Sequence, residues 1–216
     1  MKTPLRSLAN ILLRATGLYS LYALRRSGAL LEDGWFKSFS EKSSVGLDGE
    51  PLIWISYPAI DFIKDRIHKQ MSVFEYGCGT GTLWWASRVK EIMAVEHDFA
   101  WFQKIKTIAP TNVQLCHENL EYGGEYSKKI LDYRKCFDIV IIDGRDRVNC
   151  AINCIDALKE NGVIIFDDSD RRQYSKAFEF LASNGFKRIG FKGMGAGLTI
   201  KFETSIFYRT NNIFQI

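Results

Sequence analysis

Apolar positions along the second half of the chain fall into short, nearly continuous runs that alternate with helical patterns. The runs are Val73–Tyr76, Ile92–Glu96, Val113–His117, Phe137–Ile142 and Val163–Phe166. Strands of this kind, separated by helices, are typical of a parallel sheet that is covered on both faces. Two further runs, Phe186–Phe191 and Thr204–Tyr208, flank a glycine-rich segment and predict an antiparallel pair. The pattern therefore predicts a three-layer, doubly wound α/β fold with a mostly parallel sheet.

Helical periodicity is clearest in two places outside these runs. Ile60, Ile63 and Ile67 predict a helix over residues 59–69. Val148, Ile152, Ile155 and Leu158 predict a second helix, with Asn161-Gly162 as its C-terminal stop. Residues 31–58 lack a clear period and are expected to be loop. We therefore divide the chain into an N-terminal helix and loop segment, 1–58, and a main domain, 59–216.

The first thirty residues combine leucines with arginines. Leu8–Leu24 is apolar but short for a membrane span, and Arg14 interrupts it. Residues 5–26 are expected to form an amphipathic helix. Such a helix either packs on the main domain as a cap or rests on an anionic membrane surface as a peripheral contact.

Composition narrows the class of protein. At 216 residues, with 46% hydrophobic and 25% charged residues, the chain suits one globular domain. The net charge of +4 arises at the N-terminus, where Lys2, Arg6, Arg14, Arg25 and Arg26 contribute +5, which leaves 4 − 5 = −1 for the rest. A nucleic-acid partner is therefore disfavoured. Five cysteines without a C-x-x-C pair argue against a zinc site and favour a reducing, cytoplasmic setting.

The most informative motif is a glycine turn between a strand and a helix. The strand ends in Glu75, and Gly77, Gly79 and Gly81 follow at alternate positions. Glycine lets a backbone approach a bound ligand closely. A dinucleotide fingerprint needs a small third residue, but the two registers place Thr82 or Trp84 there. The turn therefore argues against a nicotinamide-dependent reductase.

This E-x-G-x-G-x-G pattern resembles motif I of the class I S-adenosylmethionine-dependent methyltransferases. The resemblance runs from Val73 to Tyr208. It implies a seven-stranded sheet of order 3-2-1-4-5-7-6 and S-adenosylmethionine as cofactor. It also implies that Glu75 and the three glycines face the positively charged methionine part of that ligand.

Two further cofactor contacts are expected at later strand ends. Glu96 ends the second strand, where a carboxylate can accept from both ribose hydroxyls, and His97 follows it. After the third strand, Glu118 or Asn119 is expected to meet the adenine.

Acidic residues also end the fourth and fifth strands. Asp143 follows strand four, and Asp167 and Asp168 follow strand five. Their positions resemble the magnesium ligands of catechol-type O-methyltransferases, in which the metal binds two acceptor oxygens. The sequence departs from that family at Asp146, where a lysine base is expected. Without a metal, Asp143 or Asp168 is the candidate catalytic base. Alternatively, these acids pair with nearby arginines, which are Arg145, Arg147, Arg171 and Arg172.

The function we expect is O-methylation of a small hydroxylated molecule or a glycan, with Mg²⁺ as an optional cofactor. The segment from Trp54 to Ala59 is a candidate to close over such an acceptor. Three alternatives remain: aminopropyl transfer, nucleic-acid methylation, and a non-catalytic relative that binds the cofactor. The lack of an N/D-P-P-Y/F motif disfavours nucleic-acid methylation. Fold alone does not identify the acceptor.

Overall fold

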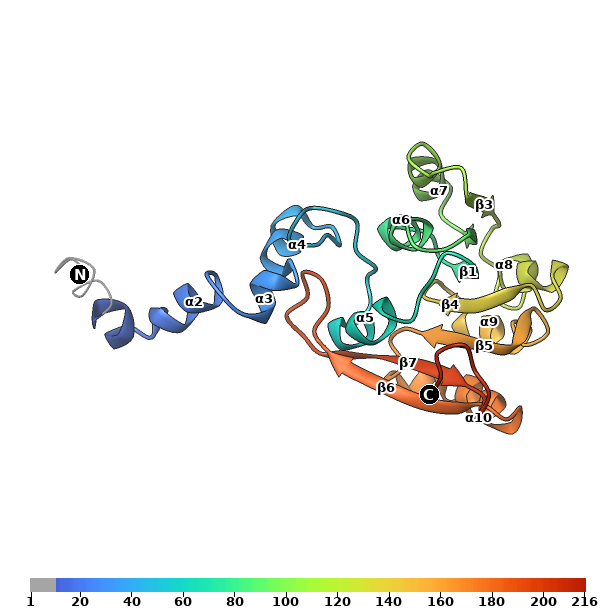
Figure 1. The fold of residues 1–216 in the computed structure, drawn as a ribbon. Coiled ribbons are helices and arrows are strands. Elements are labelled where there is room, and N and C mark those ends of the chain that lie inside the picture. The colour runs from blue at the N-terminus through green and yellow to red at the C-terminus, as the bar shows by residue number, and fades with distance from the viewer. Residues whose placement is uncertain (1–10) are drawn as a thin grey trace.

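A computed structural model describes residues 11–216. One seven-stranded sheet organises the chain, with strand order β3-β2-β1-β4-β5-β7-β6 (Figure 1). Strands β1 to β5 run parallel, whereas β7 pairs antiparallel with both β5 and β6. The predicted fold class, the strand order and the antiparallel final pair are all confirmed.

The strands lie close to the predicted apolar runs. Their bounds are Ser72–Tyr76 (β1), Glu91–Glu96 (β2), Val113–His117 (β3), Phe137–Ile142 (β4), Leu158–Phe166 (β5), Lys187–Gly193 (β6) and Phe202–Tyr208 (β7). The α-helices are Leu18–Leu24 (α2), Ala29–Glu32 (α3), Trp35–Glu41 (α4), Tyr57–Lys64 (α5), Thr80–Ala86 (α6), Phe99–Lys106 (α7), Glu125–Lys128 (α8), Arg147–Asn153 (α9) and Ser175–Ser183 (α10). Two short 3₁₀ turns occupy Lys129–Asp132 and Arg172–Tyr174.

Neighbouring residues of each strand face opposite cores. Val73 of β1 belongs to a cluster with α5 and α6, and Phe74 belongs to a cluster with α8, α9 and α10. Because both faces of the sheet are covered by apolar clusters, successive residues of a strand are both buried. The strand sequences are therefore continuous apolar runs and do not alternate between apolar and polar residues. Helices therefore cover both faces of the sheet.

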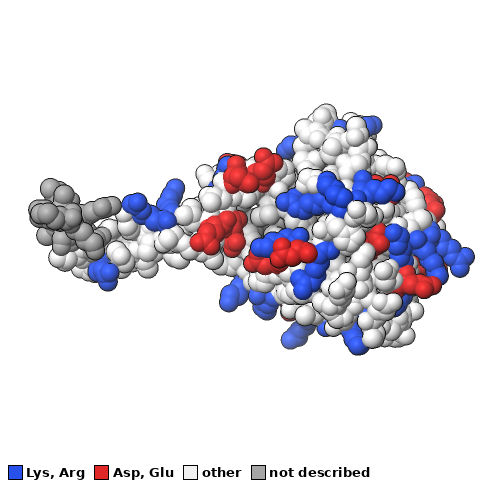
Figure 2. Space-filling view, in the orientation of Figure 1, with Lys and Arg blue, Asp and Glu red and all other residues white. Residues whose placement is uncertain are grey.

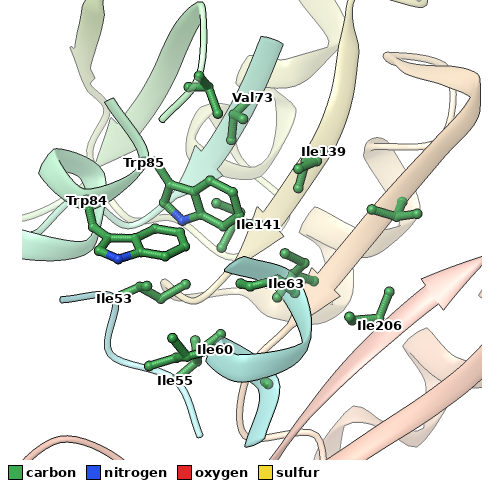
Figure 3. Close-up of a cluster of buried hydrophobic side chains, with 14 of the residues drawn as sticks. Ile53, Ile55, Ile60, Ile63, Val73, Trp84, Trp85, Ile139, Ile141 and Ile206 are labelled. Carbon is green, nitrogen blue, oxygen red and sulfur yellow. The ribbon is translucent and has the colours of Figure 1, made fainter. Parts of the chain in front are cut away.

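The first core also takes in part of the segment before α5. Ile53 and Ile55 are buried against Ile60 and Ile63 of α5 and against Trp84 and Trp85 of α6 (Figure 3). Ile53 and Ile55 are thus an integral part of the hydrophobic core of the sheet domain.

Residues 31–58 are not a continuous loop, so that prediction was wrong. They contain α4, whose Trp35 and Phe39 rings stack at 5.1 Å. Trp35 Nε1 donates to the Leu198 carbonyl oxygen (2.8 Å), and Gly197 lies against the backbone of Ser38 and Phe39. The helix is therefore stabilised by a segment about 160 residues away in sequence, a contact that local periodicity does not reveal.

The predicted helix over Val148–Leu158 was also too long. Helix α9 ends at Asn153, and Leu158 already begins β5 opposite Phe137. Asn161 and Gly162 lie inside β5, where the register with β4 shifts, rather than at a helix end. Helix α5 similarly ends at Lys64, before the predicted limit at residue 69.

Of the predicted amphipathic segment 5–26, residues 5–10 lie outside the described part of the chain. Residues 11–15 are helical, and α2 follows after Gly17. No residue of α2 is buried, so within residues 11–26 this segment does not form a cap packed on the domain. None of the helices in residues 11–216 has the length and hydropathy that crossing a bilayer requires.

Candidate active site

A cavity of about 570 Å³ opens where the carboxyl ends of β1, β2 and β4 meet. Open α/β sheets bind ligands at this edge, beside the point where the strand order reverses. Its lining includes the glycine turn, residues after β2, residues after β4 and part of the segment before α5. The sequence-predicted residues that line it are Glu75, Gly77, Gly79, Gly81, Glu96, His97 and Asp143.

The glycine turn has one position that only glycine fits well. Gly77 has φ +92°, and a Cβ there would lie 2.8 Å from the Cα of Gly144 in the loop after β4. Gly144 in turn lies against the Tyr126 hydroxyl and the Tyr76 carbonyl oxygen. The two loops that form the floor of the cavity therefore touch backbone to backbone. At Gly79, by contrast, the nearest atom to a Cβ would be Trp101 Nε1 at 4.0 Å, so this position faces the cavity.

Glu75 is held rigidly beneath the turn. Its side chain accepts a hydrogen bond from Thr82 Oγ1 (2.5 Å), and Thr82 Oγ1 accepts from the Gly79 amide (2.9 Å). Burial raises the pKa of Glu75 to about 8, the Thr82 hydrogen bond lowers it, and the nearby Glu96 charge raises it further. A cationic ligand beside Glu75 would favour its charged form.

Glu96 is fixed by backbone amides at the end of β2. The Cys78 amide donates to Oε2 (3.0 Å), and the His97 and Asp98 amides both donate to Oε1 (2.8 Å each). A carboxylate has about four acceptor positions, so these three donors leave room for a ligand hydroxyl. His97 places Nδ1 2.8 Å from Glu96 Oε1 and also lines the cavity.

The predicted adenine contacts are not brought to this cavity. Glu118 and Asn119 are absent from its lining, and Glu118 lies 3.6 Å from Lys129 Nζ instead. Their role in cofactor binding stays a prediction.

Three strand-end carboxylates converge, as expected, but on a guanidinium. Arg147 Nη2 donates to Asp143 Oδ1 (3.1 Å), and Nη1 lies 3.1 Å from Asp168 Oδ2 and 3.9 Å from Asp167 Oδ2. Arg171 adds a second ion pair to Asp168 at 2.8 Å. Asp167 also accepts from Thr204 Oγ1 (2.7 Å). The predicted alternative, pairing of these acids with nearby arginines, is therefore what the structure contains.

This arrangement does not fit a magnesium site. The Arg147 guanidinium occupies the position between the carboxylates where a metal cation would be needed, and it forms ion pairs with all three. Within residues 11–216, no three His, Cys, Asp or Glu side chains are grouped so that they could hold a metal ion.

Among the three acids only Asp143 lines the cavity. Its side chain is about a third exposed, whereas those of Asp167 and Asp168 are 6% and 15% exposed. Burial raises the pKa of Asp143 to about 7 against the lowering effect of Arg147, and the charges of Glu75 and Asp168 also raise it. A carboxyl group with a pKa near neutrality is suited to accept a proton at physiological pH.

Several lining residues escaped the sequence prediction. Trp101 lies over the turn and donates from Nε1 to the Cys78 carbonyl oxygen (2.7 Å), and Asp98 caps its helix by accepting from the Trp101 amide. An N-cap acid before an apolar helix is a recognisable signal for this pair. The remainder come from the segment before α5, and no motif marks them: Lys42, Ser43, Ser44 and Ile53.

Comparison with solved structures agrees with the topology. A precorrin-6y C5,15-methyltransferase from Geobacter metallireducens superimposes with TM-score 0.53 and 17% identity, over 70% of this chain and 87% of that chain. A Streptococcus mutans protein in complex with S-adenosylhomocysteine gives TM-score 0.51 and 14% identity, over 71% and 99%. The fold is that of the class I methyltransferases.

The class I fold also occurs in enzymes with other chemistry. Spermidine synthase from Thermotoga maritima superimposes with TM-score 0.51 and 18% identity, over 68% of this chain and 56% of that chain. No family model matches this sequence, and no curated protein matches it. At these identities the similarity concerns the fold, and the reaction has to be argued from the site.

Proposed function

We propose that this chain is an S-adenosylmethionine-dependent methyltransferase that methylates a hydroxyl group of a small molecule or a glycan. The observation that carries the proposal is the single cavity that joins the glycine turn and Glu96 to Asp143. The glycine turn and Glu96 suit a nucleoside ligand with a cationic methionine part, and Asp143 provides a proton acceptor in the same cavity.

Three acidic residues have separate roles in the proposed reaction. Glu96 accepts from ribose hydroxyls, and Glu75 beneath the turn favours the positive end of the cofactor. Bound S-adenosylmethionine supplies a methyl group that is already activated by its sulfonium. As the acceptor oxygen forms its bond to the methyl carbon, the carbon–sulfur bond breaks and its electron pair stays on sulfur, while Asp143 takes the hydroxyl proton.

Arg147 acts as a positioning residue in this scheme. It hydrogen-bonds Asp143 and forms ion pairs with Asp167 and Asp168, and of these three acids Asp143 is the one that lines the cavity. Trp54, which lines the cavity and is half exposed, offers an apolar face to the acceptor, and Ser43 offers a hydroxyl.

Calorimetric titration with S-adenosylmethionine tests the cofactor assignment. We expect micromolar binding that Glu96→Ala weakens at least tenfold, because the ribose hydroxyls lose their acceptor. Glu179→Ala, an exposed acid on α10, is the matched control and should bind like the wild type. Absence of binding by folded protein would overturn the proposal, and tighter binding of decarboxylated S-adenosylmethionine would indicate aminopropyl transfer instead.

Asp143→Asn tests the catalytic assignment separately. Loss of a general base lowers the rate by roughly 10²–10⁴-fold, while cofactor affinity should stay within about twofold. With an acceptor found by transfer of labelled methyl groups, the wild-type rate should rise with pH through about 7, where Asp143 loses its proton. A rate that is independent of pH from 6 to 8 would contradict the role of Asp143.

A further inference from the structure

The segment formed by residues 11–26, here called the N-terminal extension, stands away from the body of the protein (Figure 1). Residues 11–15 form one helical stretch, Gly17 turns with φ +73°, and α2 follows. A Cβ at Gly17 would meet no atom within 4 Å, and α2 buries no residue. Apart from Arg25, which lies over the Phe36 ring of α4 at 5.8 Å, the extension therefore gains little stability from packing against the body.

Its exposed surface is strongly apolar. Leu18, Leu21 and Tyr22 are spaced i, i+3 and i+4, so they share one face of α2. All three are exposed, with Leu21 at 62%. Ile11, Leu12 and Leu24 are exposed as well. Over the rest of the described chain large exposed apolar side chains are scattered, whereas here six fall within fourteen residues. A concentration of this kind marks an interaction surface.

The charge of the extension has one sign. Arg14, Arg25 and Arg26 are its charged residues, and the first acid in the sequence is Glu32. None of these arginines pairs with a carboxylate within residues 11–216. Arg14 and Arg26 lie over the rings of Tyr19 and Tyr22, at 4.2 and 5.4 Å. In the view of Figure 2, acidic side chains begin only where the extension meets the body.

We propose that the N-terminal extension docks this protein on an anionic lipid surface. An apolar face flanked by arginines is the pattern of a helix that lies in the membrane interface, with its leucines in the acyl boundary and its cations at the headgroups. A second copy of the extension is a poorer occupant, because two segments with three arginines and no acid lack opposite charges. The proposal does not depend on the reaction catalysed by the domain.

Co-sedimentation of the full chain with vesicles tests the proposal. We expect binding to phosphatidylglycerol vesicles and binding at least tenfold weaker to phosphatidylcholine vesicles. The Leu18→Asp/Leu21→Asp variant should lose binding to both, because it places charge on the apolar face. Ile108→Asp makes the same change at an exposed residue of the body, 55% exposed, and should bind like the wild type.

A second matched pair of variants tests the contribution of the arginines to lipid binding. Each cation near an anionic surface contributes roughly fivefold in partitioning, so Arg14→Gln/Arg25→Gln/Arg26→Gln should weaken binding by about a hundredfold. Lys176→Gln/Lys187→Gln/Lys201→Gln removes three exposed cations from the body and should have a much smaller effect. Equal effects of the two triple variants, or no lipid binding by folded wild type, would overturn the proposal. Extension-dependent dimerisation without lipid binding, seen by light scattering, would assign the surface to a second copy instead.

Discussion

At the scale of single residues, Glu75 gives the folded protein a distinct dependence on pH. Its pKa is about 8 in the folded protein and 4.5 in an unfolded chain. Between these two pH values the folded state binds more protons than the unfolded chain. The stabilisation that protonated Glu75 contributes is therefore complete below pH 4.5 and is lost as pH rises through about 8. In this window Glu75 contributes a decline in unfolding free energy of up to about 1.4 kcal/mol per pH unit.

Thermal unfolding of Glu75→Gln tests this effect without cofactor. The amide copies the neutral acid, so the variant should lose less stability than the wild type between pH 6 and 8. Asp143 and Asp167, whose pKa values are also raised by burial, leave part of the slope in both proteins. Parallel curves for the two proteins would show that Glu75 is charged in the folded state.

We expect different roles for two glycines that line the cavity: Gly144 is needed for packing, and Gly79 is needed for ligand binding. Gly144→Ala would place a methyl group against the Tyr126 hydroxyl and the Tyr76 carbonyl, so its unfolding free energy should fall by about 1–3 kcal/mol. Gly79→Ala has extended backbone and open space, so it should unfold like the wild type but bind S-adenosylmethionine at least tenfold more weakly. Calorimetry and denaturant unfolding measure both effects, and a destabilised Gly79→Ala with normal affinity would contradict the assignment.

At the scale of elements, Arg147 joins the ends of β4 and β5. Its side chain is 9% exposed, so Arg147→Met buries uncompensated carboxylates and should cost about 3–5 kcal/mol of unfolding free energy. Arg171→Met removes an ion pair whose arginine is half exposed and should cost about 1 kcal/mol or less. Denaturant unfolding at pH 7 measures both. A similar loss of unfolding free energy for the two variants would mean that Arg147 and its three carboxylate partners do not form the buried link between β4 and β5.

The elements that the sequence predicted well are those defined by local pattern. The glycine turn after β1, Glu96 at the end of β2 and the apolar strands can each be predicted from residues that are adjacent in sequence. The structure contains them in the expected order. Helix α4 was missed because it is stabilised by the Leu198 carbonyl and Gly197, far away in sequence. The sequence did not predict which arginine lies between the strand-end acids, for a similar reason. Four arginines are near these acids in sequence, and only the fold determines that Arg147 lies between them.

At the scale of the whole molecule, the segment before α5 and the last two strands complete the same core. The Ser56 amide donates to Thr204 Oγ1 (3.1 Å), and its hydroxyl donates to the Phe191 carbonyl (2.8 Å). The Tyr57 amide donates to the Met194 carbonyl oxygen (2.8 Å). Through these contacts the cavity-lining segment before α5 is joined to β6, to β7 and to the loop between them, in addition to local bonds such as that from the Leu52 amide to the Ser44 carbonyl oxygen (3.0 Å).

This fastening has a consequence for synthesis on the ribosome, where residues emerge from the N-terminus onward. The glycine turn and Glu96 are translated before the midpoint of the chain, and strands β1 to β4 can begin to pair early. Ile53 and Ile55, translated earlier still, can pack against α5 and α6, but the hydrogen bonds of Ser56 and Tyr57 form only after residues 191–204 have left the exit tunnel. The segment before α5, which lines the cavity with Ile53 and Trp54, is therefore made early but receives its last hydrogen bonds late.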